Sequence, residues 1–273
     1  MKGIYNIGNS CYLNSSLQLL FSSSDFRNIC NNIPGDSKES LICKQIELYD
    51  SLQIFNPKEI KNMVASINKI FAGFDQEDSF EFIIYLLDYI DKINNNTHNS
   101  LYDKFGLNIT INIKCKMLNC LKESEHIEND LFLQLPMTED LTESYRLYKK
   151  MHIFKDDNLY NCDNCKKKTI ARKRTIITKW PDNLIIVLKR FDHNMRKDTR
   201  KINIPLEWRH NYVLKGGIIH MGAFGGGHYI YYGNENNNWY IANDMNISLM
   251  NFNDINNYAS NSYILYYTKQ TGV

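Results

Sequence analysis

Long apolar runs are missing from this sequence. No stretch approaches the roughly 20 consecutive apolar residues that a membrane-spanning helix needs. The first ten residues, MKGIYNIGNS, also lack the apolar core of a secretory signal peptide. These two absences predict an intracellular protein, cytoplasmic or nuclear, that does not span a membrane.

A strong net charge is lacking as well. The 273 residues carry a formal net charge of +2, and 43% of them are hydrophobic and 23% charged. This is ordinary globular composition, which argues against global disorder. The near-neutral balance gives no general attraction to nucleic acid. We therefore interpret the basic run 166–174, KKKTIARKR, as a solvated strand and expect no nucleic-acid partner.

An even number of cysteines, as a disulfide framework needs, is also absent. The seven cysteines fit a reducing compartment with metal-binding or catalytic thiols better. Two pairs, Cys115 with Cys120 and Cys162 with Cys165, lie among short strand patterns. Four thiolates of this kind predict a structural zinc site. The first pair is spaced more widely than usual, so His126 could replace one sulfur as the fourth ligand. A redox pair, or a site without metal, would also explain the cysteines.

The pattern of the chain changes from helical to stranded near residue 100. Apolar residues recur with a helical period in 11–21, 41–52, 57–71 and 76–90. Short alternating or continuous apolar segments, separated by Gly and Asn turns, follow from residue 101 onward. The sequence therefore predicts an α+β fold.

Cys11 stands where the first helix is expected to begin. Asn9 or Ser10 can cap a helix whose apolar residues follow on one side. A thiol in the first turn lies beside unpaired backbone N–H groups and the positive end of the helix dipole, which favours the thiolate. Cys11 is thus a candidate nucleophile, although a buried structural cysteine explains this stretch equally well.

A cysteine nucleophile needs a histidine base and a group that orients the imidazole. His228 is the preferred base because it follows three glycines and opens a strand, and His220, at the end of an apolar strand, is the rival. Asn243 and Asp244 are candidates to hold Nδ1–H, but alternation along a strand lets only one of them face His228. Asn6, on the loop before the cysteine, is a candidate oxyanion donor.

Five segments of the chain resemble, in the same order, motifs of the ubiquitin-specific proteases. They are 6–19 (NIGNSCYLNSSLQL), 76–82 (QEDSFEF), 162–173 (CDNCKKKTIARK), 188–191 (LKRF) and 220–244, which contains GGHY and WYIAND. The resemblance covers nearly the whole chain. It implies a single catalytic domain, 1–273, with a papain-like right-hand fold: a helical thumb (1–100), zinc-ribbon-like β fingers (101–175) and an antiparallel β palm (176–273).

The same resemblance implies a role for each candidate residue. Cys11 corresponds to the nucleophile, His228 to the base and Asn243 to the third catalytic residue, with Asp244 beside it. Asn6 corresponds to the oxyanion donor. The implied reaction is hydrolysis, through a thioester, of the bond after the C-terminal glycine of ubiquitin in ubiquitin or polyubiquitin conjugates, by a monomeric enzyme.

Two substrate contacts are implied as well. Asp78 and Glu81, on the acidic face of a predicted helix, are expected to meet arginines of the ubiquitin tail. For this helix alone, a solvated acidic face is the simpler interpretation.

The segments 192–199 and 221–227 resemble the loops that narrow the active site of this family. Gly226 and Gly227 of the second segment would help to form a slot that admits only glycines.

Three further functions remain open on the sequence. The chain could bind ubiquitin with weak or no catalysis, or it could cleave a ubiquitin-like modifier. It could also be a zinc-ribbon protein that uses residues 166–174 on nucleic acid.

Overall fold

The computed structural model describes residues 1–33, 41–94, 100–120, 122–194, 196–223 and 225–270. Its helices are α1 (Cys11–Phe21), α2 (Ser24–Asn31), α3 (Leu41–Ser51), α4 (Lys58–Ile67), η1 (Lys69–Ala72), α5 (Ser79–Ile93), α6 (Leu101–Phe105), α7 (Leu141–Tyr148), η2 (Phe252–Asp254) and α8 (Ile255–Ala259). No helix in these ranges is long and apolar enough to cross a membrane.

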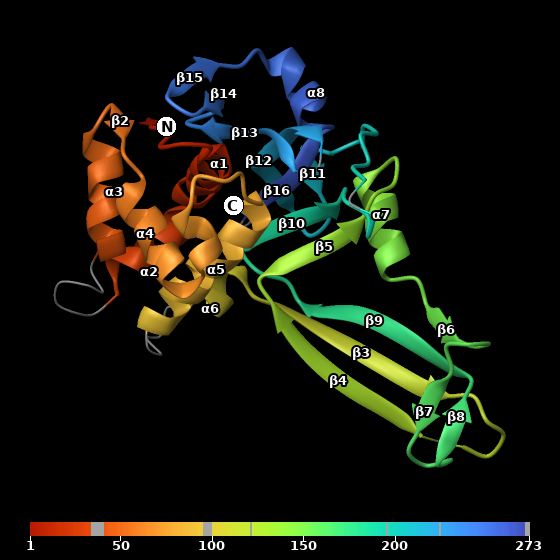
Figure 1. Cartoon of the computed structure of the whole chain (residues 1–273). Coiled ribbons are helices and arrows are strands. Elements are labelled where there is room, and N and C mark those ends of the chain that lie inside the picture. Colours follow the sequence, from red (N-terminus) through yellow and green to blue (C-terminus); the bar gives the residue numbers. More distant parts are fainter. Residues whose placement is uncertain (34–40, 95–99, 121, 195, 224, 271–273) are drawn as a thin grey trace.

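The strands form two larger sheets and two small ones. Their bounds are β1 (Gly3–Ile4), β2 (Ile54–Phe55), β3 (Leu107–Cys115), β4 (Glu123–Asp130), β5 (Phe132–Pro136), β6 (His152–Phe154), β7 (Tyr160–Cys162), β8 (Lys167–Thr169), β9 (Ala171–Lys179), β10 (Asn183–Lys189), β11 (Glu207–Trp208), β12 (Tyr212–Ala223), β13 (Gly226–Glu235), β14 (Asn238–Asn243), β15 (Asn246–Leu249) and β16 (Ser262–Lys269). The predicted α+β class is confirmed, with helices α1 to α6 gathered at one end of the molecule (Figure 1).

Helix α1 lies between α5 and strand β13 (Figure 1). Every residue of α1 is buried, so the prediction of an apolar stripe on one side only is wrong. The polar residues find partners inside the protein: Gln18 donates to the Lys2 carbonyl at 2.6 Å and accepts from the Tyr49 hydroxyl at 2.8 Å. These bonds offset the desolvation of the amide and fix α1 on all sides.

The larger sheet separates two hydrophobic cores. Its strand order is β15-β14-β13-β12-β16-β10-β5, with β11 paired to β12. Alternate side chains of β10 point to opposite faces. Ile185 and Val187 join the core under the helices, whereas Leu184, Ile186 and Leu188 join the core that contains α7 and α8. Burial on both faces explains why β10 is a continuous apolar run.

Residues 132–148 complete this larger sheet rather than the separate β region in which the sequence placed them. Strand β5 pairs with β10 in parallel, at Phe132 to Ile185 and Leu135 to Leu188. Helix α7 then packs on β5.

The second sheet, β4-β3-β9-β6, projects away from the rest of the chain and carries the β7–β8 hairpin at its far end (Figure 1). At its base, Leu107 and Ile109 of β3 and Ile177 of β9 belong to the same core as α7. This shared core anchors the projecting sheet to the body of the molecule.

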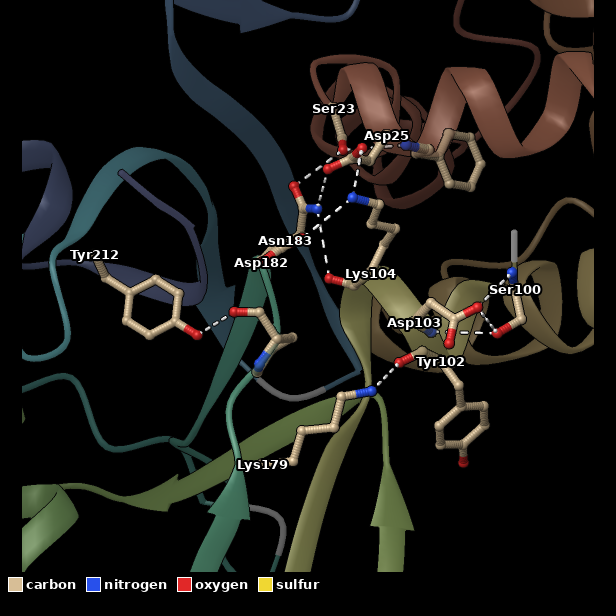
Figure 2. A network of polar contacts seen from close by, with 12 residues as sticks. Ser23, Asp25, Ser100, Tyr102, Asp103, Lys104, Lys179, Asp182, Asn183 and Tyr212 are labelled. Atoms are coloured by element: carbon tan, nitrogen blue, oxygen red, sulfur yellow. Dashed lines mark hydrogen bonds and ion pairs between the residues drawn. The ribbon is translucent and has the colours of Figure 1, made fainter. Parts of the chain in front are cut away.

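A polar network holds the helices against the larger sheet (Figure 2). At its centre, the Asn183 amide donates to Asp25 at 2.7 Å and accepts from the Tyr266 hydroxyl at 2.6 Å. The Lys104 ammonium lies 3.6 Å from an Asp25 oxygen and 3.2 Å from an Asp182 oxygen. Because Asn183 is buried and its partners come from α2 and β16, these bonds fix the orientation between the layers.

Candidate active site

Helix α1 presents Cys11 as its first residue. Ser10 occupies the N-cap position, but its side chain makes no cap hydrogen bond to the helix. The Ser10 hydroxyl instead accepts a bond from the Ile7 N–H at 2.9 Å. The N–H groups at the start of α1 are therefore not used by the cap side chain and remain suited to an anionic oxygen next to Cys11.

Cys11 itself is buried, with an exposed fraction of 3%. Burial raises the pKa of its thiol above the ordinary value, and the backbone N–H groups of Tyr229 and Tyr12 oppose this shift only in part. This shift is opposite in direction to the one expected from the helix start, because desolvation of the negative sulfur outweighs the first-turn N–H groups. The thiol has to transfer its proton before it can attack.

His228 and Asn243 form a direct pair between strands β13 and β14. Imidazole Nε2 lies 2.6 Å from the Asn243 amide oxygen. Since an amide oxygen only accepts, Nε2 carries the hydrogen and Nδ1 is the nitrogen free to take a proton. We expected the third residue to hold Nδ1–H, but Asn243 contacts Nε2 instead, so that expectation is wrong. Tyr229 is the next residue along β13, and β13 packs against α1, so the strand brings His228 and the helix that begins with Cys11 to the same part of the molecule.

Asp244 faces away from His228 and holds the N-terminal segment. Its backbone adopts a left-handed conformation, with φ of 51°, directly after β14 ends. One carboxylate oxygen accepts from the Asn6 amide at 2.8 Å, and the other accepts from the Asn14 amide at 2.7 Å. Asn243 therefore contacts the His228 imidazole, whereas Asp244 bonds to the loop that carries Asn6.

The Asn6 side chain is fixed from both ends. Its amide oxygen accepts from the backbone N–H groups of Gly8 at 3.1 Å and Ser10 at 3.2 Å, while its nitrogen donates to Asp244. An amide nitrogen has two hydrogens, so one remains for another acceptor. A donor held in this way before substrate arrives is what stabilisation of an oxyanion requires.

Asn14 and Gln76 are site residues that the sequence analysis did not single out. Asn14 lies three residues after Cys11 in the first segment that resembles the protease family, and it shares the Asp244 carboxylate with Asn6. Gln76 precedes α5 and accepts from the Gly227 N–H at 2.7 Å. The position of Asn14 in the first turn after Cys11 was the available signal for it, whereas the Gln76 contact depends on tertiary structure.

A cavity of about 380 Å³ lies between α5 and β13. Its lining includes Gln76, Glu77, Asp78, Glu81, His220 and Gly226.

Asp78 lines this cavity but is not a free surface carboxylate. It caps α5 by accepting from the Phe80 and Glu81 N–H groups at 2.7 and 3.1 Å. Hydroxyls of Tyr229 and Tyr263 donate to it as well, at 3.3 and 3.2 Å. Burial raises the pKa of Asp78, and burial followed by the Asp78 charge raises the pKa of Glu81. Of the two predicted acidic contacts, Glu81 is the one without such structural bonds among the described residues.

His220 is a packed neutral residue rather than a second base. Its ring lies between Phe191 and Tyr229, at centroid distances of 5.7 and 4.6 Å. Burial lowers the pKa of His220 to about 4, helped by the charge of Lys197. The imidazole therefore stays uncharged at neutral pH and supports the glycine segment beside it.

The four predicted metal ligands meet at the far end of the projecting sheet. The sulfur atoms of Cys115, Cys120, Cys162 and Cys165 all lie within 4.8 Å of one another, and His126 is not part of this group. The distances between Cys115 and Cys165 and between Cys120 and Cys162 are 3.9 and 3.8 Å. A tetrahedral site with Zn–S bonds of about 2.3 Å places its sulfurs about 3.8 Å apart. The donor set thus fits zinc, and a turn in which the Cys120 N–H bonds the Met117 carbonyl at 3.0 Å accommodates the wide C-x4-C spacing.

A buried cysteine at a helix start, a His–Asn pair and a fixed amide donor together define the site of a thiol-dependent hydrolase. The chain belongs to the ubiquitin carboxyl-terminal hydrolase family, whose model matches residues 2–267. It is 27% identical to ubiquitin carboxyl-terminal hydrolase 25 of Arabidopsis thaliana over 98% of this chain and 47% of that protein. It is 24% identical to probable ubiquitin carboxyl-terminal hydrolase 8 of Schizosaccharomyces pombe, over 98% of this chain and 64% of that protein.

A third relative is ubiquitin carboxyl-terminal hydrolase 4 of Vanderwaltozyma polyspora, which is 24% identical over 99% of this chain and 41% of that protein. The chain thus spans between 41% and 64% of the length of these relatives.

Gly227 and Gly226 offer a matched pair of variants for the packing of the glycine segment. A Cβ on Gly227 would lie 2.3 Å from both His220 Nε2 and the Met221 carbonyl oxygen, whereas a Cβ on Gly226 would meet no described atom within 4 Å. We expect Gly227→Ala to lower the free energy of unfolding by about 1–3 kcal/mol through overpacking. Gly226→Ala should change it by less than about 0.5 kcal/mol. Urea denaturation of the two variants checks this, and equal stability would contradict it.

Proposed function

We propose that this chain is a deubiquitinating cysteine protease that hydrolyses the isopeptide or peptide bond after the C-terminal glycine of ubiquitin. The single observation that carries the proposal is the 2.6 Å contact between His228 and Asn243, on two strands that pack against the helix that begins with Cys11. The membership of the ubiquitin carboxyl-terminal hydrolase family supports the choice of substrate.

The proposed reaction proceeds through a thioester. His228 Nδ1 takes the proton of the Cys11 thiol, and the sulfur attacks the carbonyl carbon of the terminal glycine. The oxyanion of the intermediate accepts bonds from the free Asn6 amide hydrogen and from N–H groups at the start of α1. The imidazolium then returns its proton to the departing amine. Water, deprotonated by His228, hydrolyses the thioester and restores the thiol.

The raised pKa of the buried thiol opposes this proton transfer. A buried sulfur that is neutral at rest favours transfer only when the imidazolium is stabilised, and the Asn243 oxygen supplies that stabilisation at Nε2–H. The carboxylate of Asp244 is bonded to Asn6 and Asn14, and its charge helps to raise the pKa of the Cys11 thiol. Base and oxyanion donor are therefore positioned by two adjacent residues.

The finer architecture of the family is part of the proposal. Helices α1 to α6 would form the thumb, strands β3, β4 and β6 to β9 the fingers, and the larger sheet with α7 and α8 the palm of a right hand, in one monomeric catalytic domain. The ubiquitin tail would enter between α5 and β13, where Glu81 and Gly226 line the cavity. A glycine pair is the tail sequence that such a slot accepts.

Structural zinc at the end of the fingers is the second part of the proposal. The sulfur distances of 3.8 and 3.9 Å support four-coordinate binding by Cys115, Cys120, Cys162 and Cys165. The four cysteines join β3 to the β7–β8 hairpin, so bound metal would hold the tip of the projecting sheet together. No catalytic step involves it.

An electrophilic probe that carries ubiquitin up to its C-terminus tests the reaction. We expect the wild-type chain to form a covalent adduct, because the warhead occupies the position of the scissile carbonyl next to Cys11. Cys11→Ala should form none, while Cys43→Ala, which changes a cysteine outside the site, should react as the wild type does. Binding of ubiquitin without labelling would favour a non-catalytic module, and preferential labelling by a ubiquitin-like probe would identify a different modifier.

Variants of Asn6, Asn243 and Asp244 separate the two positioning roles. Asn6→Ala should lower kcat about 10²–10³-fold through loss of one oxyanion donor, and Asn243→Ala about 10²–10⁴-fold through loss of the oriented base. Only Asn243→Ala should also shift the pH profile of kcat/KM, because it acts on the imidazole. Asp244→Ala should add little to Asn6→Ala, since both disturb the same donor. Additive losses would mean that Asp244 acts on His228 directly.

Metal analysis tests the zinc site. We expect about one zinc ion per chain in the wild type, and none in Cys162→Ser, because three sulfurs no longer close the tetrahedron. The Cys43→Ser control should retain its zinc, since Cys43 lies outside the cluster. A zinc-free wild type that still reacts with the ubiquitin probe would rule the metal out.

A further inference from the structure

The small net charge of the whole chain hides a strong separation of charge within the projecting sheet. Residues 149–179 contain ten Lys and Arg against three Asp, a formal charge of +7 in a chain of +2. Strand β4, at one edge of the sheet, carries four acidic residues and no Lys or Arg. The basic residues lie on β9, beside the opposite edge strand β6, and in the neighbouring turns and hairpin.

A cavity of about 330 Å³ lies on this basic side. It is lined by Tyr148, Lys150, His152, Phe154, Lys173 and Thr175. His152 stands directly opposite Lys173 in the pairing of β6 with β9. Phe154 and Thr175 follow two residues further along their strands and so share that face of the sheet. The end of α7 and the turn after it supply Tyr148 and Lys150, which close the cavity.

The cations of this cavity are available to a ligand. No carboxylate lines it, and within the described ranges neither Lys150 nor Lys173 forms an ion pair, although Lys114 on the same sheet pairs with Glu123 at 3.2 Å. The cavity between α5 and β13 differs, because Glu77, Asp78 and Glu81 line it. Unpaired lysines around a concave surface attract an anion.

The aromatic residues indicate which kind of anion. Tyr148 and Phe154 line the cavity together with the two lysines, and the Phe154 ring is held by an edge contact with His152 at 4.9 Å. Sites for single-stranded nucleic acid combine cations on the phosphates with aromatic rings against the bases. An acidic peptide would use the lysines but gain little from the rings. The volume also suits one nucleotide better than a single carboxylate.

We propose that the cavity between α7, β6 and β9 is a binding site for single-stranded nucleic acid, in which Lys150 and Lys173 contact phosphates and Phe154 contacts a base. None of these residues belongs to the Cys11 site. We interpreted the basic run as a solvated strand because the net charge of the whole chain is small. The fold, however, gathers these basic residues beside a concave surface. The proposal does not depend on the protease activity.

Binding of a fluorescein-labelled oligouridylate of about 12 nucleotides, measured by anisotropy over a range of salt concentrations, tests the site. The double variant Lys150→Ala/Lys173→Ala should weaken binding at least about tenfold and reduce the slope of log K against log salt by about 1.4, or about 0.7 for each lost phosphate contact. Phe154→Leu should weaken binding about 5-fold or more and leave the slope unchanged, because it removes stacking and no charge.

The control variant Lys58→Ala/Lys69→Ala removes the same charge from exposed positions on the helical side of the chain. It should bind the oligonucleotide as the wild type does. Unchanged ubiquitin-probe labelling and an unchanged melting temperature confirm that the variants are folded. Equal losses in the control, insensitivity to Phe154→Leu, or tighter binding of a polyglutamate peptide than of the oligonucleotide would each overturn the proposal, the last in favour of an acidic protein segment.

Discussion

The carboxylate of Asp244 is the contact on which the geometry of the site depends. It joins residues that lie 238 and 230 positions away along the chain, Asn6 and Asn14, and its backbone carbonyl also accepts from the Ile4 N–H at 2.9 Å. The loop before Cys11 therefore has its position only once the last strands of the larger sheet have formed. The proposed oxyanion donor, nucleophile and base are brought together through long-range contacts of this kind, which makes the candidate site a property of the whole fold.

Local patterns predicted most of the helices and strands, because periodicity is a short-range property of the chain. The segments 41–52 and 76–90 became α3 and most of α5, and the alternating residues 107–114 became β3. Two features failed for the same reason. The burial of α1 on every side depends on α5 and β13, and the parallel pairing of β5 with β10 joins Phe132 to Ile185, more than 50 residues away. The local sequence pattern of α1 or of β5 does not reveal the distant segments against which each of them packs.

The sequence predicted which residues form the candidate site better than it predicted their pKa values and hydrogen-bond partners. Motifs identified Cys11, His228 and Asn243, but not that burial raises the thiol pKa or that Asn243 holds Nε2. Both facts depend on how far each group is from water and on which ring nitrogen faces the next strand. Asp78 is a similar case. Its carboxyl group suggested a surface contact with the substrate, but its position directly before α5 makes it the N-cap of that helix.

The cysteine cluster and the basic cavity depend on neighbouring strands of the projecting sheet. The cysteine cluster ties β3 to the β7–β8 hairpin, and the β9 strand that follows this hairpin carries Lys173 into the cavity. β9 pairs with both β3 and β6, so the register that places Lys173 opposite His152 is fixed by the same strands that bring the sulfurs together. A structural metal at the tip would therefore order a recognition surface about 30 Å long at most, since a nine-residue strand rises about 3.3 Å per residue. Catalysis at Cys11 and nucleic-acid binding on the projecting sheet would then occupy separate parts of one chain. A different ligand could therefore bind the sheet without altering the site around Cys11.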